Sequence, residues 1–221
     1  DELIYIDITR QGSHDYQRDD LGGMSISFTK SIQEIIKAVS KKCFMPCTFG
    51  GGIRKIEDAR ERFELGADKI TLNSQAINNK NFITELANEF GSQAIVISMD
   101  VKQIKNSEYR VFNNWGTVDT GIKPEDWAKE VEERGAGEIL LNSIDRDGKA
   151  NGYDLSLIEN VVSSTNIPII ACGGVGDYSD FQKAITNTDV SAVAAGNIFH
   201  FKELSYPIAK RHLKKNGLNI R

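Results

Sequence analysis

Short apolar runs recur along the chain and predict its strands. Seven runs rich in Ile, Val and Ala predict buried β-strands at residues 3–8, 46–49, 69–73, 94–99, 138–142, 168–172 and 190–195. Between these runs, apolar residues recur with the helical period, as in residues 31–39, 56–63 and 124–131. Pro124 in a first turn and Gly66 directly after Leu65 are start and stop signals for two of these helices. The strict alternation of strand and helix predicts a parallel sheet with right-handed crossovers.

Two segments of the first half of the chain recur in the second half. Residues 45–53 are similar to residues 167–175, at an offset of 122, and residues 2–6 are similar to residues 138–142, at an offset of 136. The second half holds four predicted strands and the first half three, whereas eight strand–helix units close a barrel. We therefore expect an α/β fold, a (β/α)8 TIM barrel built by duplication of a half-barrel. The first strand–helix unit is missing from this sequence and is expected upstream of Asp1.

The composition is that of a packed globular protein. The 221 residues are 40% hydrophobic and 26% charged, with only 4 Pro, which excludes disordered and fibrous classes. Barrels of about 200–250 residues form one domain, so we expect a single domain over residues 1–221. The net charge of −4, from 27 basic and 31 acidic residues, argues against nucleic acid as the main partner. No apolar stretch approaches the ~20 residues of a membrane span, so no membrane partner is expected.

Three cysteines, Cys43, Cys47 and Cys172, are an odd number in a chain of this length. They predict neither a disulfide framework nor a secreted protein, and a reducing cytoplasm fits them best. Cys43 and Cys47 resemble half of a zinc site, but no second Cys or His pair follows at a ligand spacing. We therefore expect no metal site and no cofactor.

Glycine turns follow two equivalent strands, at residues 50–52 and 173–174. Such a turn can be a tight strand-to-helix connection and nothing more. Alternatively, glycine lets backbone N–H groups approach an anion at the start of the following helix. Small polar residues follow the next strand in each half, and this symmetry favours two phosphate sites on one face of the barrel. One site is predicted at Gly52, Asn73 and Ser74, and the other at Gly148, Gly174, Gly196 and Asn197.

Two aspartates, Asp7 and Asp100, each close an apolar strand run. A carboxylate at the C-terminal end of a barrel strand lies in a partly dry, concave site, where its pKa can be tuned for proton transfer. The alternative is a helix cap or a loop ion pair. After another strand, residues 145–148 (Asp-Arg-Asp-Gly) predict either a turn with an internal ion pair or a polar cluster that includes Asp147.

Three charged residues, Glu2, Lys69 and Glu138, lie at the opposite, N-terminal ends of the strand runs. Such charges are usually a solvated rim. Their mixed sign at equivalent positions also allows a ring of ion pairs that closes the bottom of the barrel, an arrangement that is costly unless the charges pair.

The histidines carry little information. His200 and His212 lie in C-terminal helical sequence, where surface or core positions are the ordinary case. His14 lies in a polar, Gly-containing stretch at residues 10–27, which the difference between the two offsets marks as an enlarged loop. On the face where barrels carry out chemistry, His14 could reach a substrate.

Nine segments together carry a resemblance to one known family: residues 49–53, 66–69, 72–73, 90–96, 134–141, 143–148, 152–154, 173–174 and 199–201. They resemble the cyclase subunit of imidazole glycerol phosphate synthase, an enzyme of histidine biosynthesis. The similarity extends over nearly the whole chain. The stretch from residue 138 to residue 148 separates this family from its sister isomerase, which shares the half-barrel duplication and the glycine turns.

The resemblance implies a barrel that binds a bis-phosphorylated aminoimidazole carboxamide ribonucleotide and accepts ammonia from a glutaminase subunit. Its products would be imidazole glycerol phosphate and the carboxamide nucleotide. Asp100 matches one of two catalytic aspartates, the other lying before the first residue here. Glu2, Lys69 and Glu138 match members of a gate for ammonia. The expected substrate and phosphate contacts are Asp7, Gly52, Asn73, Ser74, Asn142, Asp147, Gly148, Cys172, Gly174, Gly196 and Asn197.

Three positions depart from the family pattern and leave alternatives open. Asn142, Cys172 and Asn197 stand where the histidine-pathway enzymes more often carry small hydroxyl residues. Residues 43–46 and 141–143 resemble the corresponding segments of paralogues encoded with surface-polysaccharide genes. That resemblance implies a protein that supplies ammonia for the formation of amidino sugars. A further alternative is a non-catalytic barrel scaffold, which is favoured if the first strand and its aspartate are absent from the whole protein.

Overall fold

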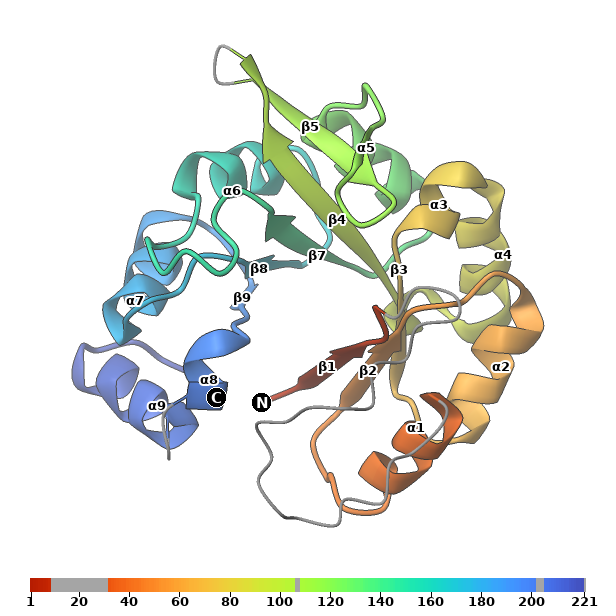
Figure 1. The fold of residues 1–221 in the computed structure, drawn as a ribbon, viewed down its shortest axis with the longest axis horizontal. Helices are drawn as coiled ribbons and strands as arrows, with labels where there is room; N and C mark the ends of the chain where they lie inside the picture. Colours follow the sequence, from red (N-terminus) through yellow and green to blue (C-terminus); the bar gives the residue numbers. More distant parts are fainter. Residues whose placement is uncertain (9–31, 106–107, 202–204, 221) are drawn as a thin grey trace. The chain divides into compact units, whose positions relative to one another are not determined.

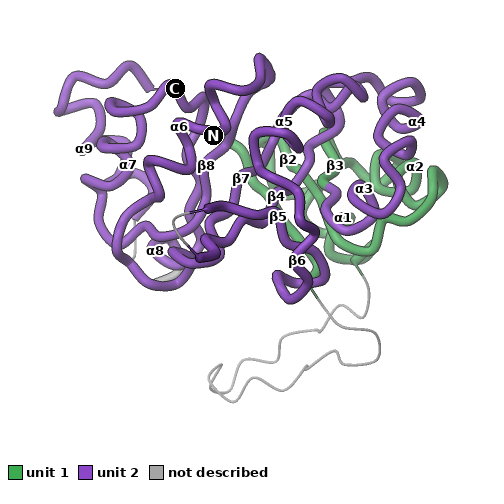
Figure 2. Tube along the Cα trace, turned by 90° about the horizontal axis from the view of Figure 1, so that it is seen from above, with its two compact units in different colours: residues 1–71 green, residues 72–221 purple. Residues whose placement is uncertain are grey.

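The computed structural model describes residues 1–8, 32–105, 108–201 and 205–220. The chain forms two compact units, unit 1 from Asp1 to Thr71 and unit 2 from Leu72 to Arg221 (Figure 2). The expected loop at residues 10–27, with His14, lies outside the described residues.

Unit 1 is a parallel strand–helix repeat. Its strands are β1 (Leu3–Ile6), β2 (Cys47–Gly50) and β3 (Lys69–Leu72), and its helices are α1 (Ile32–Ser40) and α2 (Ile56–Glu64). β2 lies between β1 and β3, and Leu3 pairs with Cys47 in the first of the two parallel ladders. The apolar runs and the helical periods therefore predicted these five elements to within two residues.

The core of unit 1 forms where α1 covers the first two strands. Ile36, Cys47 and Phe49 are fully buried. The partly buried residues packed against them are Leu3, Tyr5, Ile32, Val39, Cys43, Leu65 and Ala67. The apolar positions of α1 follow the helical period, so one stripe of the helix faces β1 and β2. Burial of these side chains holds β1, α1 and β2 together.

Unit 2 continues the alternation. Its parallel strands are β4 (Ile95–Gln103), β7 (Glu138–Ser143), β8 (Ile169–Cys172) and β9 (Ala192–Val193), adjacent in that order. Its helices are α3 (Ser74–Asn78), α4 (Asn81–Phe90), the 3-10 turn η1 (Ser92–Ala94), α5 (Pro124–Glu133), α6 (Leu155–Val162), α7 (Tyr178–Asn187), α8 (Asn197–Phe201) and α9 (Ser205–Lys215). The helices α5, α6 and α7 lie on one side of these strands (Figure 1). Pro124 stands in the first turn of α5, as predicted. No helix within the described ranges is long and apolar enough to cross a membrane.

An antiparallel hairpin interrupts the alternation after β4, so the prediction of strict alternation was wrong at this point. β5 (Tyr109–Asn113) pairs antiparallel with the end of β4, and β6 (Val118–Asp119) pairs with β5. The turn between them has three successive residues with positive φ, Asn114, Trp115 and Gly116. The sequence of the hairpin shows little hydrophobic pattern. Both residues of β6 are exposed, and only the last three residues of β5 are buried.

The internal repeat has the same backbone geometry in both units. The N–H of Leu3 donates to Pro46 O over 3.0 Å, and at the equivalent place the N–H of Ile139 donates to Pro168 O over 3.0 Å. Gly51 and Gly173, 122 residues apart, have φ of +92° and +94°. A Cβ at Gly51 would lie 2.2 Å from the carbonyl oxygen of Asp7, after β1. A Cβ at Gly173 would lie 2.8 Å from the carbonyl oxygen of Ser143, at the end of β7. Only glycine fits these turns, which explains why the motif occurs twice.

The helix after each glycine turn starts with the same cap. Asp58 Oδ2 accepts hydrogen bonds from the N–H groups of residues 54 and 55, at 2.9 and 3.1 Å. Asp180 Oδ2, again 122 residues further, accepts from residues 176 and 177 at 3.1 and 3.0 Å. A carboxylate in the first turn satisfies free N–H groups and complements the helix dipole. The two turns are therefore fixed in the same way from the helix side.

Candidate active site

Asp100 lies on β4 between two asparagine side chains. Asn142 is its register partner on β7, and Asn142 Nδ2 donates to Asp100 Oδ1 over 2.9 Å. Asn73, directly before α3, donates from Nδ2 to Asp100 Oδ2 over 2.7 Å. Each carboxylate oxygen thus accepts one amide hydrogen bond, which fixes the plane of the carboxyl group.

The pKa of the Asp100 carboxyl is raised above its ordinary value. Burial is the main cause, and the negative charge of Asp147 adds to it, whereas the hydrogen bonds from Asn142 and Asn73 act in the opposite direction. A carboxyl group whose pKa is raised toward the working pH can both give and take a proton. Asp100 therefore has the geometry and the electrostatics of a general acid or base.

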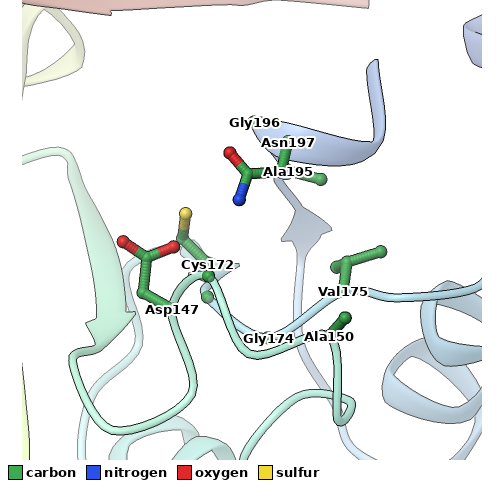
Figure 3. Close-up of a pocket in the computed structure, with 10 residues that line it drawn as sticks. Asp147, Ala150, Cys172, Gly174, Val175, Ala195, Gly196 and Asn197 are labelled. Carbon is green, nitrogen blue, oxygen red and sulfur yellow. The ribbon is translucent and has the colours of Figure 1, made fainter. Parts of the chain in front are cut away.

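A pocket lies at the C-terminal ends of β8 and β9 (Figure 3). Two of its lining residues, Asp147 and Cys172, interact electrostatically with Asp100. Its lining brings together six residues that the sequence predicted for substrate or phosphate binding: Asp147, Gly148, Cys172, Gly174, Gly196 and Asn197. In Figure 3 the Asp147 carboxylate and the Cys172 thiol lie side by side, and the Asn197 amide lies across the pocket from the Gly174 turn. The pocket is small and its walls are largely backbone, which suits a compact anion.

Two glycines of this pocket have left-handed backbone conformations. Gly148 has φ of +73° and Gly174 has φ of +105°. A Cβ at Gly174 would lie 2.2 Å from Gly152 O and 2.9 Å from the Cβ of Arg146, whereas at Gly148 it would meet nothing within 4 Å. Gly174 is thus required for the close packing of two loops, and Gly148 for its backbone conformation only.

The thiol of Cys172 stays protonated in this pocket. Burial raises the pKa of Cys172 to about 11, and the nearby charges of Asp147 and Asp100 act in the same direction. A neutral thiol is a weak hydrogen-bond donor and a poor nucleophile. Cys172 is therefore suited to line the pocket and has no features of a catalytic nucleophile.

The Asp-Arg-Asp segment after β7 forms a polar cluster. Asp145 Oδ2 accepts from the N–H of Gln103 over 2.6 Å, and Arg146 Nη1 donates to Asn151 O over 3.3 Å. Asp147 lines the pocket. These contacts favour the second of the two interpretations drawn from the sequence, a polar cluster, because each of the three charged side chains contacts a different part of the protein.

The residues of the other predicted phosphate site are divided between the units. Gly52 belongs to unit 1 and has φ of +69°. Asn73 and Ser74 belong to unit 2, where Asn73 holds Asp100 and Ser74 begins α3. Asp7 follows β1, and its N–H donates to Gly50 O over 3.0 Å. The grouping of Gly52 with Asn73 and Ser74 remains a prediction.

One ion pair of the predicted gate is present in unit 1. Lys69 Nζ lies 3.1 Å from Glu2 Oε2, with the Lys69 side chain 16% exposed. Glu138 is half-buried at the start of β7 in unit 2. The pair joins the N-terminal ends of β1 and β3, the strands on either side of β2, and the ring of three remains a prediction.

No group of three or more His, Cys, Asp or Glu side chains in the described parts of the chain is arranged to hold a metal ion. Cys43 and Cys47 have their sulfur atoms 3.5 Å apart. Burial, together with a hydrogen bond to Cys43, raises the pKa of the Cys47 thiol to about 12. Both cysteines are free thiols.

Comparisons with known proteins identify the family. A family model described as "Histidine biosynthesis protein" matches residues 20–205. The "Imidazole glycerol phosphate synthase subunit HisF" of Hydrogenobaculum sp. is 40% identical over the whole chain, which covers 82% of that relative. The proteins of the same name from Alkaliphilus metalliredigens and Natranaerobius thermophilus are 39% and 41% identical, with the same coverage. The chain belongs to the HisF family.

Membership of the HisF family confirms the predicted fold class and the prediction of an enzyme. The alternation of parallel strands and helices in both units is that of the (β/α)8 barrel of this family. The chain is an enzyme subunit of the cyclase type. A non-catalytic scaffold is accordingly not supported. The position of Asp100 between two asparagines is consistent with an enzyme.

Two features of the HisF chain were missed in the sequence. The two amide hydrogen bonds to the Asp100 carboxylate were not expected, although aligning the strand ends places residues 100 and 142 side by side. Arg62 of α2 is buried against the Gly51–Gly52 turn, with Nη2 3.3 Å from Gly51 O. A signal existed, because Arg62 follows the buried Ala59 by three residues and so lies on the same face of the helix.

Proposed function

We propose that this chain is an ammonia-dependent cyclase of histidine biosynthesis. It acts on a bis-phosphorylated aminoimidazole carboxamide ribonucleotide and forms imidazole glycerol phosphate and the aminoimidazole carboxamide nucleotide. The observation that carries the proposal is the Asp100 carboxyl, clamped by two amides and interacting electrostatically with two lining residues of a pocket with glycine turns. The name of the relatives, which match the whole chain, supports the pathway.

Asp100 moves protons in this proposal. Addition of ammonia, closure of the imidazole ring and cleavage of the adduct each require a proton to be placed or removed. A carboxyl group held in a fixed plane and with a raised pKa can do both. Asn73 and Asn142 hold it by their Nδ2 atoms, and their buried Oδ1 atoms accept no hydrogen bond from any described residue.

The phosphate groups bind at the two glycine turns. One site consists of Gly148, Gly174 and Asn197, with Gly196 and the neutral Cys172 thiol beside them, and it is supported by their common pocket. The other consists of Gly52, Asn73 and Ser74. A substrate with a phosphate at each end suits a duplicated fold with one turn in each half. We further propose that residues 1–221 belong to one barrel domain.

Ammonia comes from a glutaminase subunit and enters between the charges of Glu2, Lys69 and Glu138. The Lys69–Glu2 ion pair supports this step, since a partly exposed pair can open at little cost. The balance of charge and the cysteine content favour a cytoplasmic enzyme without a nucleic-acid or membrane partner.

Turnover of the histidine-pathway nucleotide by the purified full-length protein, with an ammonium salt as nitrogen source, tests the proposal. Formation of imidazole glycerol phosphate is expected. The sister function, ammonia supply for amidino sugars of surface polysaccharides, is less well supported because the matching relatives carry the HisF name. Absence of turnover, both with an ammonium salt and with a glutaminase partner, would contradict the proposal. The function of the paralogue would then be the better explanation.

A further inference from the structure

Arg62 is a buried cation beneath the first glycine turn. Its side chain is 5% exposed, and Nη2 donates to Gly51 O over 3.3 Å. Among the described residues Arg62 forms an ion pair with Glu61, whose carboxylate is 3.7 Å from Nη1 on a side chain that is 48% exposed. Arg62 Nε is buried and donates to no group of the described residues. The described residues of unit 1 therefore compensate the positive charge of Arg62 only weakly.

The contact to Gly51 O also fixes the next N–H group. The carbonyl of Gly51 and the N–H of Gly52 belong to one peptide plane, which is trans, so they point in opposite directions. Arg62 holds the carbonyl side of this plane. The Gly52 N–H therefore points away from Arg62, and no described residue accepts a hydrogen bond from it. A cation on the oxygen side strengthens the peptide dipole and makes this N–H a better donor to an anion.

We propose that Arg62 is a positioning residue of this turn, which orients the Gly52 N–H and gives the first glycine turn its preference for a doubly charged phosphate group. The inference rests on the proposed function, because it assumes that this turn binds one phosphate of the substrate. Arg62 acts through the Gly51–Gly52 peptide, and its charge becomes compensated when the phosphate binds.

The second glycine turn lacks this device. The position equivalent to Arg62, 122 residues further along, is Ala184, which is fully buried in α7. No cation can reach the Gly173–Gly174 peptide from that place on the helix. Arg146 lies close to the second turn, but its Nη1 donates to Asn151 O. The two turns, otherwise alike in backbone and cap, therefore differ in whether a cation is hydrogen-bonded to the turn peptide. The first turn binds phosphate more tightly, and this difference sets which end of the substrate goes to which turn.

The test follows individual glycine N–H groups by NMR. The chain has 19 glycines, so a sample labelled with 15N at glycine gives a short list of signals in which Gly52 and Gly174 can be assigned. Inorganic phosphate is titrated into the full-length protein, into Arg62→Met and Arg62→Lys, and into the control Arg60→Met. Arg60 is exposed on the same helix, two residues before Arg62.

In the wild-type protein the Gly52 signal is expected to shift at lower phosphate concentration than the Gly174 signal. Arg62→Met should raise the half-saturation concentration at Gly52 about tenfold, since a buried charge near an anion is removed, and leave Gly174 unchanged. Arg62→Lys should recover part of the affinity because it keeps the charge but not the planar donor. Arg60→Met should behave as wild type.

Thermal unfolding separates this role from a structural one. Methionine is apolar and unbranched, so replacing a poorly paired buried charge by it should leave the melting temperature of the protein unchanged or higher. A lower melting temperature with unchanged phosphate binding at Gly52 would mean that Arg62 serves the fold alone. A Gly52 signal that ignores phosphate in the wild-type protein would also overturn the inference.

The outcome for the proposed function is separate. If Gly52 binds phosphate through Arg62 but the nucleotide is not turned over, the function falls and the anion site remains. If the nucleotide is turned over and Arg62→Met binds phosphate at Gly52 like wild type, the inference on Arg62 falls and the function remains.

Discussion

Asn142 Nδ2 donates to Asp100 Oδ1 across the parallel ladder between β7 and β4, over 2.9 Å. The two residues are register partners, so the pairing of the strands alone brings them together. Because Asn73 holds the second oxygen, the Asp100 carboxyl cannot rotate without losing a hydrogen bond. A proton on this group is therefore presented in one direction, which is the geometric requirement for acid or base catalysis.

Asp100→Asn should abolish cyclase activity and keep the fold. The change is nearly isosteric. One of the amides of Asn73 and Asn142 can rotate by 180° to accept from the new Nδ2, since its oxygen is otherwise unused by the described residues, while the other amide goes on donating to the new Oδ1. The ammonium-dependent kcat should fall by about 10²-fold or more. Circular dichroism and thermal unfolding serve as the control for folding. A variant that retains a tenth of the wild-type rate would show that Asp100 is not the acid or base.

The same residue predicts how stability depends on pH. The pKa of Asp100 is raised in the folded state, mainly by burial, so the folded protein binds this proton more tightly than the unfolded chain. Its contribution to stability is fully present below the ordinary carboxyl pKa of about 3.9 and is lost as the pH rises through the raised value. Relative to Asp100→Asn, the wild-type protein should therefore lose free energy of unfolding over this interval. Parallel curves for the two proteins in urea unfolding at several pH values would contradict the shift.

The strands β3, β4, β7 and β8 could be predicted from sequence because each is a largely buried run rich in β-branched and aliphatic residues. The repeated glycine turn at the ends of β2 and β8 shows from the sequence alone that these two strands are equivalent. The hairpin of β5 and β6 could not be found in this way, because its stability comes from pairing with the end of β4 and not from its own pattern. Local propensity is a weak guide where partner strands decide the structure.

Candidate site residues were predictable where a single local feature marks them, such as Asp100 at the end of a strand run. Their interactions were less accessible. The hydrogen bond from Asn73 to Asp100 joins residues 27 positions apart on different elements, and no period in the sequence reports it. Arg62 illustrates the opposite case, since its place on the buried face of α2 could be read from the helical period, but its contact to Gly51 O could not.

Two glycines of the pocket predict opposite effects of the same substitution. Gly174→Ala should destabilise the protein by about 1–3 kcal/mol or more, because φ is +105° and the new Cβ would meet Gly152 O at 2.2 Å. Gly196→Ala should change stability by less than ~0.5 kcal/mol, since its Cβ meets nothing within 4 Å. The new methyl group would still occupy the pocket, so KM for the nucleotide should rise in Gly196→Ala. Urea unfolding and initial rates measure the two effects, and equal stability losses would contradict this account of the turn.

Lys69 tests whether the charges at the N-terminal strand ends guide ammonia. The Lys69–Glu2 pair is partly exposed, so removing it should change stability by only about 0–1 kcal/mol. If the pair belongs to the gate, Lys69→Ala should weaken glutamine-dependent turnover with the glutaminase subunit by about 2- to 30-fold, the range of coupling energies that single residues carry. Activity with added ammonium salt should stay near wild type, because free ammonia can reach the substrate without the gate. Lys80→Ala is the matched control, since it removes another partly exposed ion pair. Lys80 lies directly before α4 and 3.2 Å from Glu130 of α5, and neither residue belongs to the gate. The decisive quantity is the ratio of the two rates in each variant. A ratio for Lys69→Ala that equals the ratios of wild type and Lys80→Ala would assign the pair to the fold and not to a path for ammonia.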